Sequence, residues 1–162
     1  MRITGKVVDF ATKTPIEGAV LDTWKAANDG LYENQDEQQP DYNLRGRFRS
    51  DANGEFELIA LMPTAYPVPT DGPVGELLRA AKRPPGRPAH IHFIVSAPGF
   101  ETLVTQIFVN GDEKIEEDAV FRASKNMIGN FRCAGDHMQL RYDFPFKRGE
   151  SKMPKAPIPS QE

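Results

Sequence analysis

The sequence predicts an all-β fold, a sandwich of short strands joined by turns, with one or two short helices. Apolar and polar residues alternate with a period of two in several runs, which is the pattern of strands that rest one face on a core. Fourteen prolines and thirteen glycines among 162 residues are many for a helical bundle and are typical of a turn-rich β protein. One domain is expected at this length, and it is large enough to fold without disulfides or a structural metal.

Seven strands are expected along the chain. The clearest alternation lies in residues 44–49, 55–60 and 138–144. Asn53-Gly54 separates the first two of these runs and predicts a hairpin turn, because both residues tolerate positive φ. The predicted strands span residues 2–9, 18–26, 43–50, 54–61, 89–96, 102–110 and 137–144.

Three segments depart from the strand pattern. Residues 75–83 (GELLRAAKR) have helical spacing and a basic last turn, and the Pro84-Pro85 pair ends the predicted helix. A second short helix is expected over residues 113–125. From Lys147 onward the chain has no apolar period, which predicts a sandwich domain of residues 1–146 and an extended C-terminal arm of residues 147–162. The arm could reach a neighbouring subunit in a homo-oligomer, although nothing in its sequence requires one.

Composition narrows the classes of function. The chain carries 20 Lys+Arg against 23 Asp+Glu, a formal charge of −3, which gives no reason to expect binding to nucleic acid or to an anionic membrane. No apolar run approaches the length of a membrane span, and the start MRITGKVVDF lacks the features of a secretory signal. A single cysteine cannot form an internal disulfide. We therefore expect a soluble, cytoplasmic protein.

His90-Ile91-His92 is the sharpest local feature. The run HIHFIV alternates, so His90 and His92 share one face of a strand while Ile91 and Phe93 share the other. Two imidazoles at positions i and i+2 point the same way and can ligate one metal ion. Two polar residues on a solvated sheet face would give the same pattern, and the motif alone is weak.

Two tyrosines lie in segments that could supply further functional groups. Tyr66 is surrounded by prolines, which stiffen a loop at the end of a strand, and a rigid loop suits a precisely placed side chain. Tyr32 lies in the acidic loop of residues 29–41. Taken alone, each tyrosine is more simply interpreted as a half-buried aromatic with its hydroxyl in water.

Six segments in a fixed order change this interpretation. They are GKVVDFATKTPIEGAVLDTWKAANDGLY, NLRGRFRSDANGEF, LMPTAYPVPTDGPVGELL, RPAHIHFIVSAPGF, LVTQIFVNGD and DAVF, and they cover roughly residues 3–128. Their joint occurrence resembles the intradiol ring-cleaving dioxygenases, the family of catechol, chlorocatechol, hydroxyquinol and protocatechuate dioxygenases. YPVPTDGPVG and DAVF look most like the hydroxyquinol branch. The resemblance implies a prealbumin-like β-sandwich.

The resemblance also implies a metal centre, a non-haem Fe(III) ion held by Tyr32, Tyr66, His90 and His92. Tyr32 ends the segment GLY, Tyr66 ends MPTAY, and the histidines are those of RPAHIH. Phenolate oxygens are hard, anionic donors that favour the ferric ion. The family pattern makes Tyr66 and His90 the axial ligands and Tyr32, His92 and a hydroxide the equatorial ones. It further implies a catalytic role for Tyr66, which leaves the metal and acts as a base when a diol binds.

The implied reaction inserts both atoms of O2 into a catechol-type ring between the two hydroxyl-bearing carbons and gives a cis,cis-muconate-type product. Arg87 matches the family arginine that faces the ring, where a fixed guanidinium stabilises developing negative charge. Gln106 matches a second polar residue of the pocket. Ala119 and Val120 in DAVF are expected to line it. The implied partners are O2 and a small aromatic diol, with hydroxyquinol or a substituted catechol favoured.

The sequence departs from the family in one respect and leaves one alternative. The catechol and hydroxyquinol branches carry a helical segment before the sandwich, whereas here the sandwich motif begins at Ile3, so we expect a more open pocket that tolerates bulkier rings. The first motif alone also resembles the prealbumin-like repeats of adhesins and carboxypeptidase accessory domains. The alternative is therefore a binding or structural module without catalytic iron.

Overall fold

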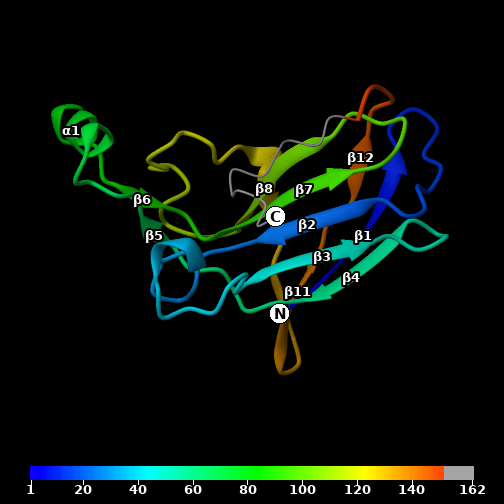
Figure 1. The fold of residues 1–162 in the computed structure, drawn as a ribbon, viewed down its shortest axis with the longest axis horizontal. Helices are drawn as coiled ribbons and strands as arrows, with labels where there is room; N and C mark the ends of the chain where they lie inside the picture. The colour runs from blue at the N-terminus through cyan, green and yellow to red at the C-terminus, as the bar shows by residue number, and fades with distance from the viewer. Residues whose placement is uncertain (152–162) are drawn as a thin grey trace.

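Two β-sheets packed face to face form the body of the molecule, in a computed structural model that describes residues 1–151 (Figure 1). The strands of the first sheet are β1 (Arg2–Asp9), β4 (Glu55–Ile59), β10 (Arg132–Ala134), β11 (His137–Arg141) and β12 (Phe144–Phe146). In this sheet, the central strand is β1. It pairs antiparallel with β4 on one side, and on the other side it pairs parallel with β11 and then with β12. The predicted all-β sandwich is confirmed.

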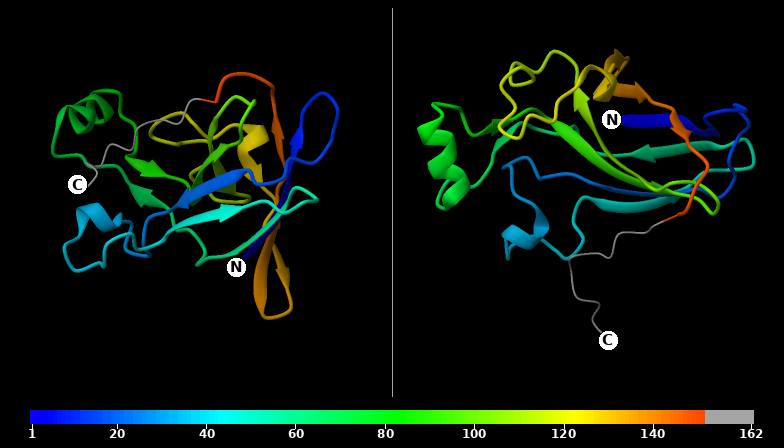
Figure 2. Two further views of the ribbon diagram at one scale, coloured as in Figure 1. Left: turned by 45° about the vertical axis from the view of Figure 1, so that its right-hand side comes forward. Right: turned by 90° about the horizontal axis from the view of Figure 1, so that it is seen from above.

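The second sheet has the order β3-β2-β7-β8-β9 and carries His90, His92 and Trp24 on its outer face. Its strands are β2 (Val20–Trp24), β3 (Arg45–Arg49), β7 (His90–Ser96), β8 (Leu103–Val109) and β9 (Ile128–Gly129). A two-stranded ribbon, β5 (Tyr66–Pro67) with β6 (Gly86–Arg87), and the helix α1 (Pro73–Ala80) lie beyond one end of the sheets (Figure 2). The ribbon, β9 and β10 were not expected from the sequence, because two or three residues are too few to show a period.

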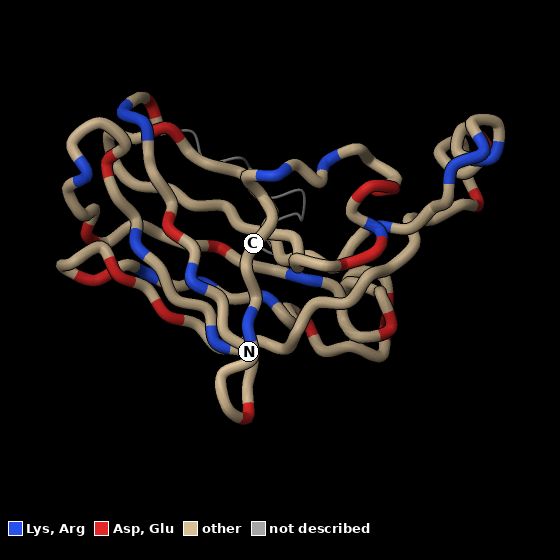
Figure 3. Tube along the Cα trace, turned by 180° about the vertical axis from the view of Figure 1, so that it is seen from behind, with Lys and Arg blue, Asp and Glu red and all other residues tan. Residues whose placement is uncertain are grey.

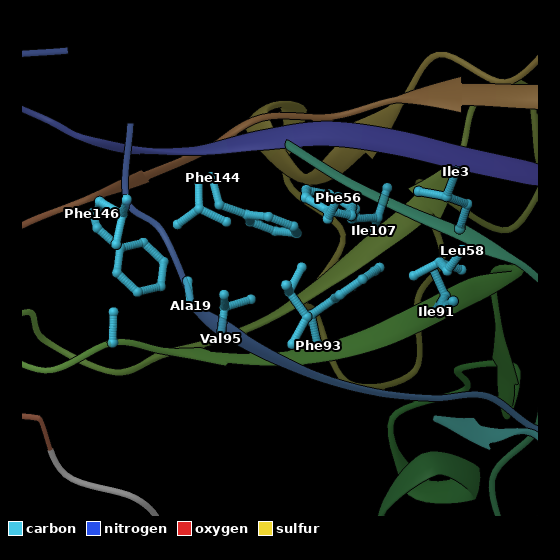
Figure 4. Close-up of a cluster of buried hydrophobic side chains, with 14 of the residues drawn as sticks. Ile3, Ala19, Phe56, Leu58, Ile91, Phe93, Val95, Ile107, Phe144 and Phe146 are labelled. Atoms are coloured by element: carbon cyan, nitrogen blue, oxygen red, sulfur yellow. The ribbon is translucent and has the colours of Figure 1, made fainter. Parts of the chain in front are cut away.

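The core lies between the two sheets and is rich in aromatic side chains (Figure 4). The ring of Phe144 has its centroid 5.6 Å from that of Phe56 and 5.2 Å from that of Phe93, so β12, β4 and β7 meet at one point. Burying a side chain of this size stabilises the fold by about 1.5–3 kcal/mol. The buried residues of this cluster include Ile3, Val7, Leu21, Phe56, Leu58, Ile91, Phe93, Val95, Ile107, Leu140, Phe144 and Phe146.

The strand predicted over residues 137–144 is interrupted at Tyr142 and Asp143. The Tyr142 N–H donates to the Thr4 carbonyl, and the Asp143 carboxylate accepts the Lys6 N–H at 2.8 Å, so a side chain replaces a ladder hydrogen bond there. A Cβ atom on Gly5 would overlap the Tyr142 carbonyl oxygen. The chain can therefore bulge toward β1 only because residue 5 is glycine.

The helix predicted over residues 75–83 is present, whereas the helix predicted over residues 113–125 is not formed. Helix α1 begins at Pro73, earlier than predicted, and ends at Ala80, before Lys82 with its positive φ of 52°. Residues 113–121 form successive turns and bends, residues 122–124 are irregular, and a 3-10 helix follows at Lys125–Met127. The helix fails because side-chain and distant carbonyl oxygens accept the N–H groups of this segment. Asp118 accepts three of them, and the Gly86 carbonyl accepts that of Ala119.

The predicted C-terminal arm starts directly after β12. Its first residues lie against the sandwich, since the Lys147 carbonyl accepts the Glu101 N–H and Arg148 pairs with the buried Asp9 at 2.8 Å. Residues 152–162 of the arm lie outside the described residues.

Charges of both signs are interspersed over the strands and loops (Figure 3). Within residues 1–151, no helix is long and apolar enough to cross a membrane.

Candidate metal centre

Strand β7 places two histidines on the outer face of the second sheet. Ile91 and Phe93 point into the core, so His90 and His92 point away from it, as the alternation predicts. In the register of the sheet, His92 lies between Trp24 of β2 and Gln106 of β8. The sheet therefore fixes the position of both imidazoles and surrounds one of them with an indole and an amide.

The two tyrosines reach this face from loops. Tyr66 begins the short ribbon and pairs with Arg87, three residues before His90. Tyr32 precedes a 3-10 helix at Glu33–Gln35, where its N–H donates to the Gln35 side chain. Gly30, with φ of 88°, lies so close to Tyr66 that a Cβ atom there would be 2.7 Å from the Tyr66 Cβ. Glycine at this position allows the two tyrosine-bearing segments to touch.

Four donor atoms converge at the centre of this face. The Tyr32 hydroxyl lies 2.6 Å from the Tyr66 hydroxyl and 2.9 Å from His92 Nε2. His90 Nε2 lies 3.1 Å from His92 Nε2 and 3.3 Å from the Tyr66 hydroxyl. Ligands bound at about 2.0–2.1 Å and at right angles lie roughly 2.9 Å apart. The donors thus have the spacing of ligands around one ion.

The protonation of the histidines suits metal binding. His90 Nδ1 donates its proton to the Pro88 carbonyl at 2.7 Å, so Nε2 carries the lone pair and faces the centre. Burial, which outweighs the hydrogen bond to Pro88, lowers the pKa of His90 to about 4. Burial and the neighbouring His90 and Arg87 lower the pKa of His92 to about 3. Both imidazoles are therefore neutral at pH 7 and need not lose a proton to bind a cation.

Unlike the two histidines, Tyr32 must lose a proton before it can bind a cation. Burial and the hydrogen bond with Tyr66 raise the pKa of the Tyr32 phenol well above its ordinary value. The phenol is neutral in the metal-free chain, and a bound cation is what would release its proton. Two phenol oxygens and two imidazole nitrogens form a hard, anionic donor set that fits a ferric ion. Among the described residues, no group of three or more His, Cys, Asp or Glu side chains could hold a metal ion.

A second set of side chains lies beside the four donors. The Arg87 guanidinium donates from Nη1 to His90 Nε2 at 3.1 Å, from Nη2 to Gln106 Oε1 at 2.8 Å and from Nε to Asp118 Oδ1 at 3.1 Å. Arg87 is 6% exposed, so these contacts lie in a region with little water. The structure brings Arg87 and Gln106 together next to the histidines.

The segment of residues 118–121 lies beside Arg87, because the Asp118 carboxylate accepts from Arg87 Nε. Ala119 is buried, and Val120, 46% exposed, lies at the surface. Asp118 was expected from the sequence only as part of this segment. Its contact with Arg87 was missed, because nothing in the sequence connects a carboxylate to an arginine 31 positions earlier. Trp24 was also missed as a site residue. Its alternation with Asp22 and Val20 places it on the outer face, where its indole stacks on His92.

Comparison with known proteins assigns the family. A family model described as Dioxygenase matches residues 1–148. The chain belongs to the intradiol dioxygenase family. It is 46% identical over 137 residues to hydroxyquinol 1,2-dioxygenase from Rhizobium sp., covering 84% of this chain and 46% of the relative. It is 46% identical over 131 residues to 6-chlorohydroxyquinol 1,2-dioxygenase from Cupriavidus pinatubonensis, covering 80% of this chain and 48% of the relative.

Solved structures of the intradiol dioxygenases have the same sandwich. The crystal structure of hydroxyquinol 1,2-dioxygenase from Pseudomonas putida superposes with a TM-score of 0.85 at 39% identity, covering 91% of this chain and 56% of that one. The chain thus spans about half the length of the relatives it matches. Members of the family use non-haem iron, and nothing in these comparisons favours a binding module without a catalytic centre.

Proposed function

We propose that the chain cleaves a small aromatic diol with O2 by intradiol chemistry, placing both oxygen atoms in a cis,cis-muconate-type product. The observation that carries this proposal is the convergence of Tyr32, Tyr66, His90 and His92 within hydrogen-bond distance of one another in a chain of this family. In the metal-free chain these atoms hydrogen-bond to one another, and a bound cation would replace those contacts with four ligand bonds.

Fe(III) is the proposed occupant, with those four side chains as its ligands. When bound, the ferric ion supplies Lewis acidity that holds the two diol oxygens and makes the ring reactive toward O2. Neutral imidazoles at His90 and His92 give it nitrogen lone pairs at pH 7. Tyr32 and Tyr66 give it oxygen donors whose protons must leave, so ion binding releases protons to solvent.

Tyr66 is the proposed base. Its hydroxyl lies 2.6 Å from the Tyr32 hydroxyl and 3.3 Å from His90 Nε2, so a proton accepted there has neighbours that can share it. Tyr66 lies on the peripheral ribbon instead of the central sheet, and a side chain on such an element can move farther than one on β7. A phenolate oxygen within hydrogen-bond reach of a diol hydroxyl can take its proton.

Arg87 and Gln106 are proposed to contact the ring. The guanidinium stays protonated, and in a site with little water it stabilises negative charge that develops on the substrate. Gln106 Oε1 accepts from Arg87 Nη2, which fixes the amide and directs its NH2 group away from the arginine. Ala119 and Val120 are small, so the wall they form leaves room for a substituted ring. Hydroxyquinol and substituted catechols are therefore the proposed substrates.

The test combines colour, substrate range and isotope incorporation. Iron-loaded protein should be red-brown from tyrosinate-to-iron charge transfer, and a panel of catechol, hydroxyquinol, pyrogallol, alkylcatechols and chlorocatechols should identify its substrate. With 18O2, mass spectrometry should find both labelled atoms in the product. A colourless, iron-free chain that leaves every diol unchanged would instead support the binding-module alternative. Turnover of plain catechol far above that of every substituted catechol would contradict the proposed preference for substituted rings.

A further inference from the structure

Asp118 is a buried carboxylate whose role the proposed chemistry leaves unassigned. Its side chain is 2% exposed and accepts the Arg87 Nε–H at 3.1 Å. It also accepts the N–H groups of Arg122 at 2.8 Å, Ala123 at 3.1 Å and Val120 at 3.4 Å. One carboxylate thus connects the strand that holds Arg87 to the loop of residues 118–123.

The contact with Arg87 decides how the guanidinium is oriented. Asp118 takes the Nε side, which leaves Nη1 for His90 and Nη2 for Gln106. A guanidinium is planar, so partners on three of its nitrogens fix both its position and its plane. When His90 Nε2 binds the ion, its single lone pair can no longer accept from Nη1, so Asp118 and Gln106 are the two partners that hold the guanidinium. Without Asp118, only the contact with Gln106 would remain.

The same carboxylate shapes the pocket loop. Phe121 has a positive φ of 55°, which an aromatic residue adopts only when its surroundings enforce it. The three N–H groups held by Asp118 provide that enforcement, together with Arg83, whose guanidinium lies 3.9 Å from the Phe121 ring centroid and donates to the Asp118 carbonyl. Ala119 and Val120 follow Asp118 directly, so their distance from Arg87 depends on it.

Charge favours the same arrangement. Burial alone would raise the pKa of the Asp118 carboxyl, but the hydrogen bonds from Arg87 and from the Arg122 and Val120 N–H groups lower it below its ordinary value. Asp118 is therefore ionised at neutral pH and compensates the buried charge of Arg87. Their side chains are 2% and 8% exposed, so solvent screens this pair little.

We propose that Asp118 is a positioning residue that acts through Arg87, holding the guanidinium beside the four donors and the loop of residues 118–123 at a fixed distance from them. The inference rests on the proposed function, in which Arg87 faces the substrate ring. In this proposal Asp118 determines where Arg87 and the loop of residues 118–123 lie, without touching the substrate itself.

A double-mutant cycle tests the proposal in the iron-loaded chain. D118N keeps the shape of the side chain and removes its charge, and R87M removes the guanidinium. We expect D118N to retain iron and the charge-transfer band while kcat/KM for the preferred diol and affinity for 4-nitrocatechol fall about 10- to 100-fold, as displaced catalytic groups typically cause. Because Asp118 acts in part through Arg87, D118N should cost clearly less in the R87M background than in the parent chain. Unchanged kinetics in D118N, or losses that simply multiply in the double variant, would overturn the proposal.

A metal-free measurement separates this proposal from the proposed function. The Arg87 Nε–H should give a 15N-resolved NMR signal protected from solvent exchange in the parent chain, identified by its absence in R87M, and unprotected in D118N. D136N is the matched control, because Asp136 is an exposed acid paired with His137 and should leave the signal intact. A parent chain that binds no iron would refute the proposed function, and the NMR result would still decide the contact. Equal protection in the parent chain and D118N would refute the positioning role.

Discussion

The indole of Trp24 lies flat against the imidazole of His92, with ring centroids 4.7 Å apart and 2° between the planes. The two residues face each other across neighbouring strands, so the sheet register sets this stack. Arg45 lies on the other strand beside Trp24, its guanidinium carbon 5.9 Å from the ring centroid and its Nε bonded to Glu33. Trp24, with Arg45 beside it, thus holds the His92 ring in place, and His92 Nε2 faces the other three donor atoms.

Trp24 is the only tryptophan in the chain, which makes it a reporter of metal binding. We expect ferric ion to quench its fluorescence as the ion binds beside His92, and a chelator to restore it. Titration of metal-free protein with ferric ion, followed by emission, measures this. H92A should bind iron weakly and show little quenching at the same concentration. Quenching that persists in H92A would place the ion elsewhere.

Loss of the Tyr32 oxygen should abolish the charge-transfer colour. Y32F removes one of two anionic donors, and we expect iron affinity to fall by more than about 100-fold, beyond the effect of removing a group that merely supports a ligand. Iron content and the visible spectrum measure this. Y42F is the control, because Tyr42 is exposed and lies outside the cluster. An unaltered spectrum in Y32F would show that the ligand assignment is wrong.

Gly30 should tolerate no side chain. G30A places a Cβ 2.7 Å from the Tyr66 Cβ in a backbone conformation with φ of 88°, and we expect a loss of about 1–3 kcal/mol in the free energy of unfolding together with weaker iron binding. G99A separates the two causes, since Gly99 has a φ of 81° and open space around its Cβ position. Urea unfolding should show a larger loss for G30A than for G99A. Equal losses would mean that contact with Tyr66 is unimportant.

Acid should destabilise the metal-free chain before its carboxylates titrate. The pKa values of His90 and His92 fall from 6.5 to about 4 and about 3 on folding, so below pH 6.5 the unfolded chain binds more protons than the folded one. This stability is present above pH 6.5 and is lost as the pH falls toward 4, by up to about 1.4 kcal/mol per pH unit for each imidazole. Urea unfolding between pH 7.5 and 5 measures it.

The exposed His137 provides the comparison for that experiment. H137A should keep the parent's dependence on pH, whereas H92F should lose part of it. A free energy of unfolding that stays constant from pH 7.5 to 5 in the parent would contradict the burial of neutral imidazoles.

The sequence predicts this molecule best where its structure is periodic. The alternation in HIHFIV assigns His90 and His92 to the face opposite Ile91 and Phe93, and the structure agrees because each strand residue follows the pleat of its sheet. The segment of residues 113–125 shows the limit of that reasoning. Its turns depend on an Asp118 carboxylate whose partner Arg87 lies 31 residues away, and no local pattern records such a contact.

Contacts between loops could not be predicted from the sequence pattern either. Gly30 could be identified as a turn residue, but its contact with Tyr66 depends on where the ribbon folds back. The family resemblance supplied the pairing of Tyr32 with Tyr66 that spacing alone could not. Their hydroxyls lie 2.6 Å apart in the structure, while their role as ligands stays a prediction that the spectra of Y32F will decide.

The four donors also have a mechanical consequence, because they come from segments far apart along the chain. Tyr32 and Tyr66 are separated by 34 residues, and Tyr66 and His90 by 24. An ion bound to all of them would close two chain loops at once, as a covalent staple does, and would stabilise the folded chain further as its free concentration rises. The aromatic core lies on the opposite side of β7 and has no part in this closure. Removing the ion should therefore loosen the ribbon and the Tyr32 loop first, so that the rim of the pocket melts while the sandwich beneath it persists.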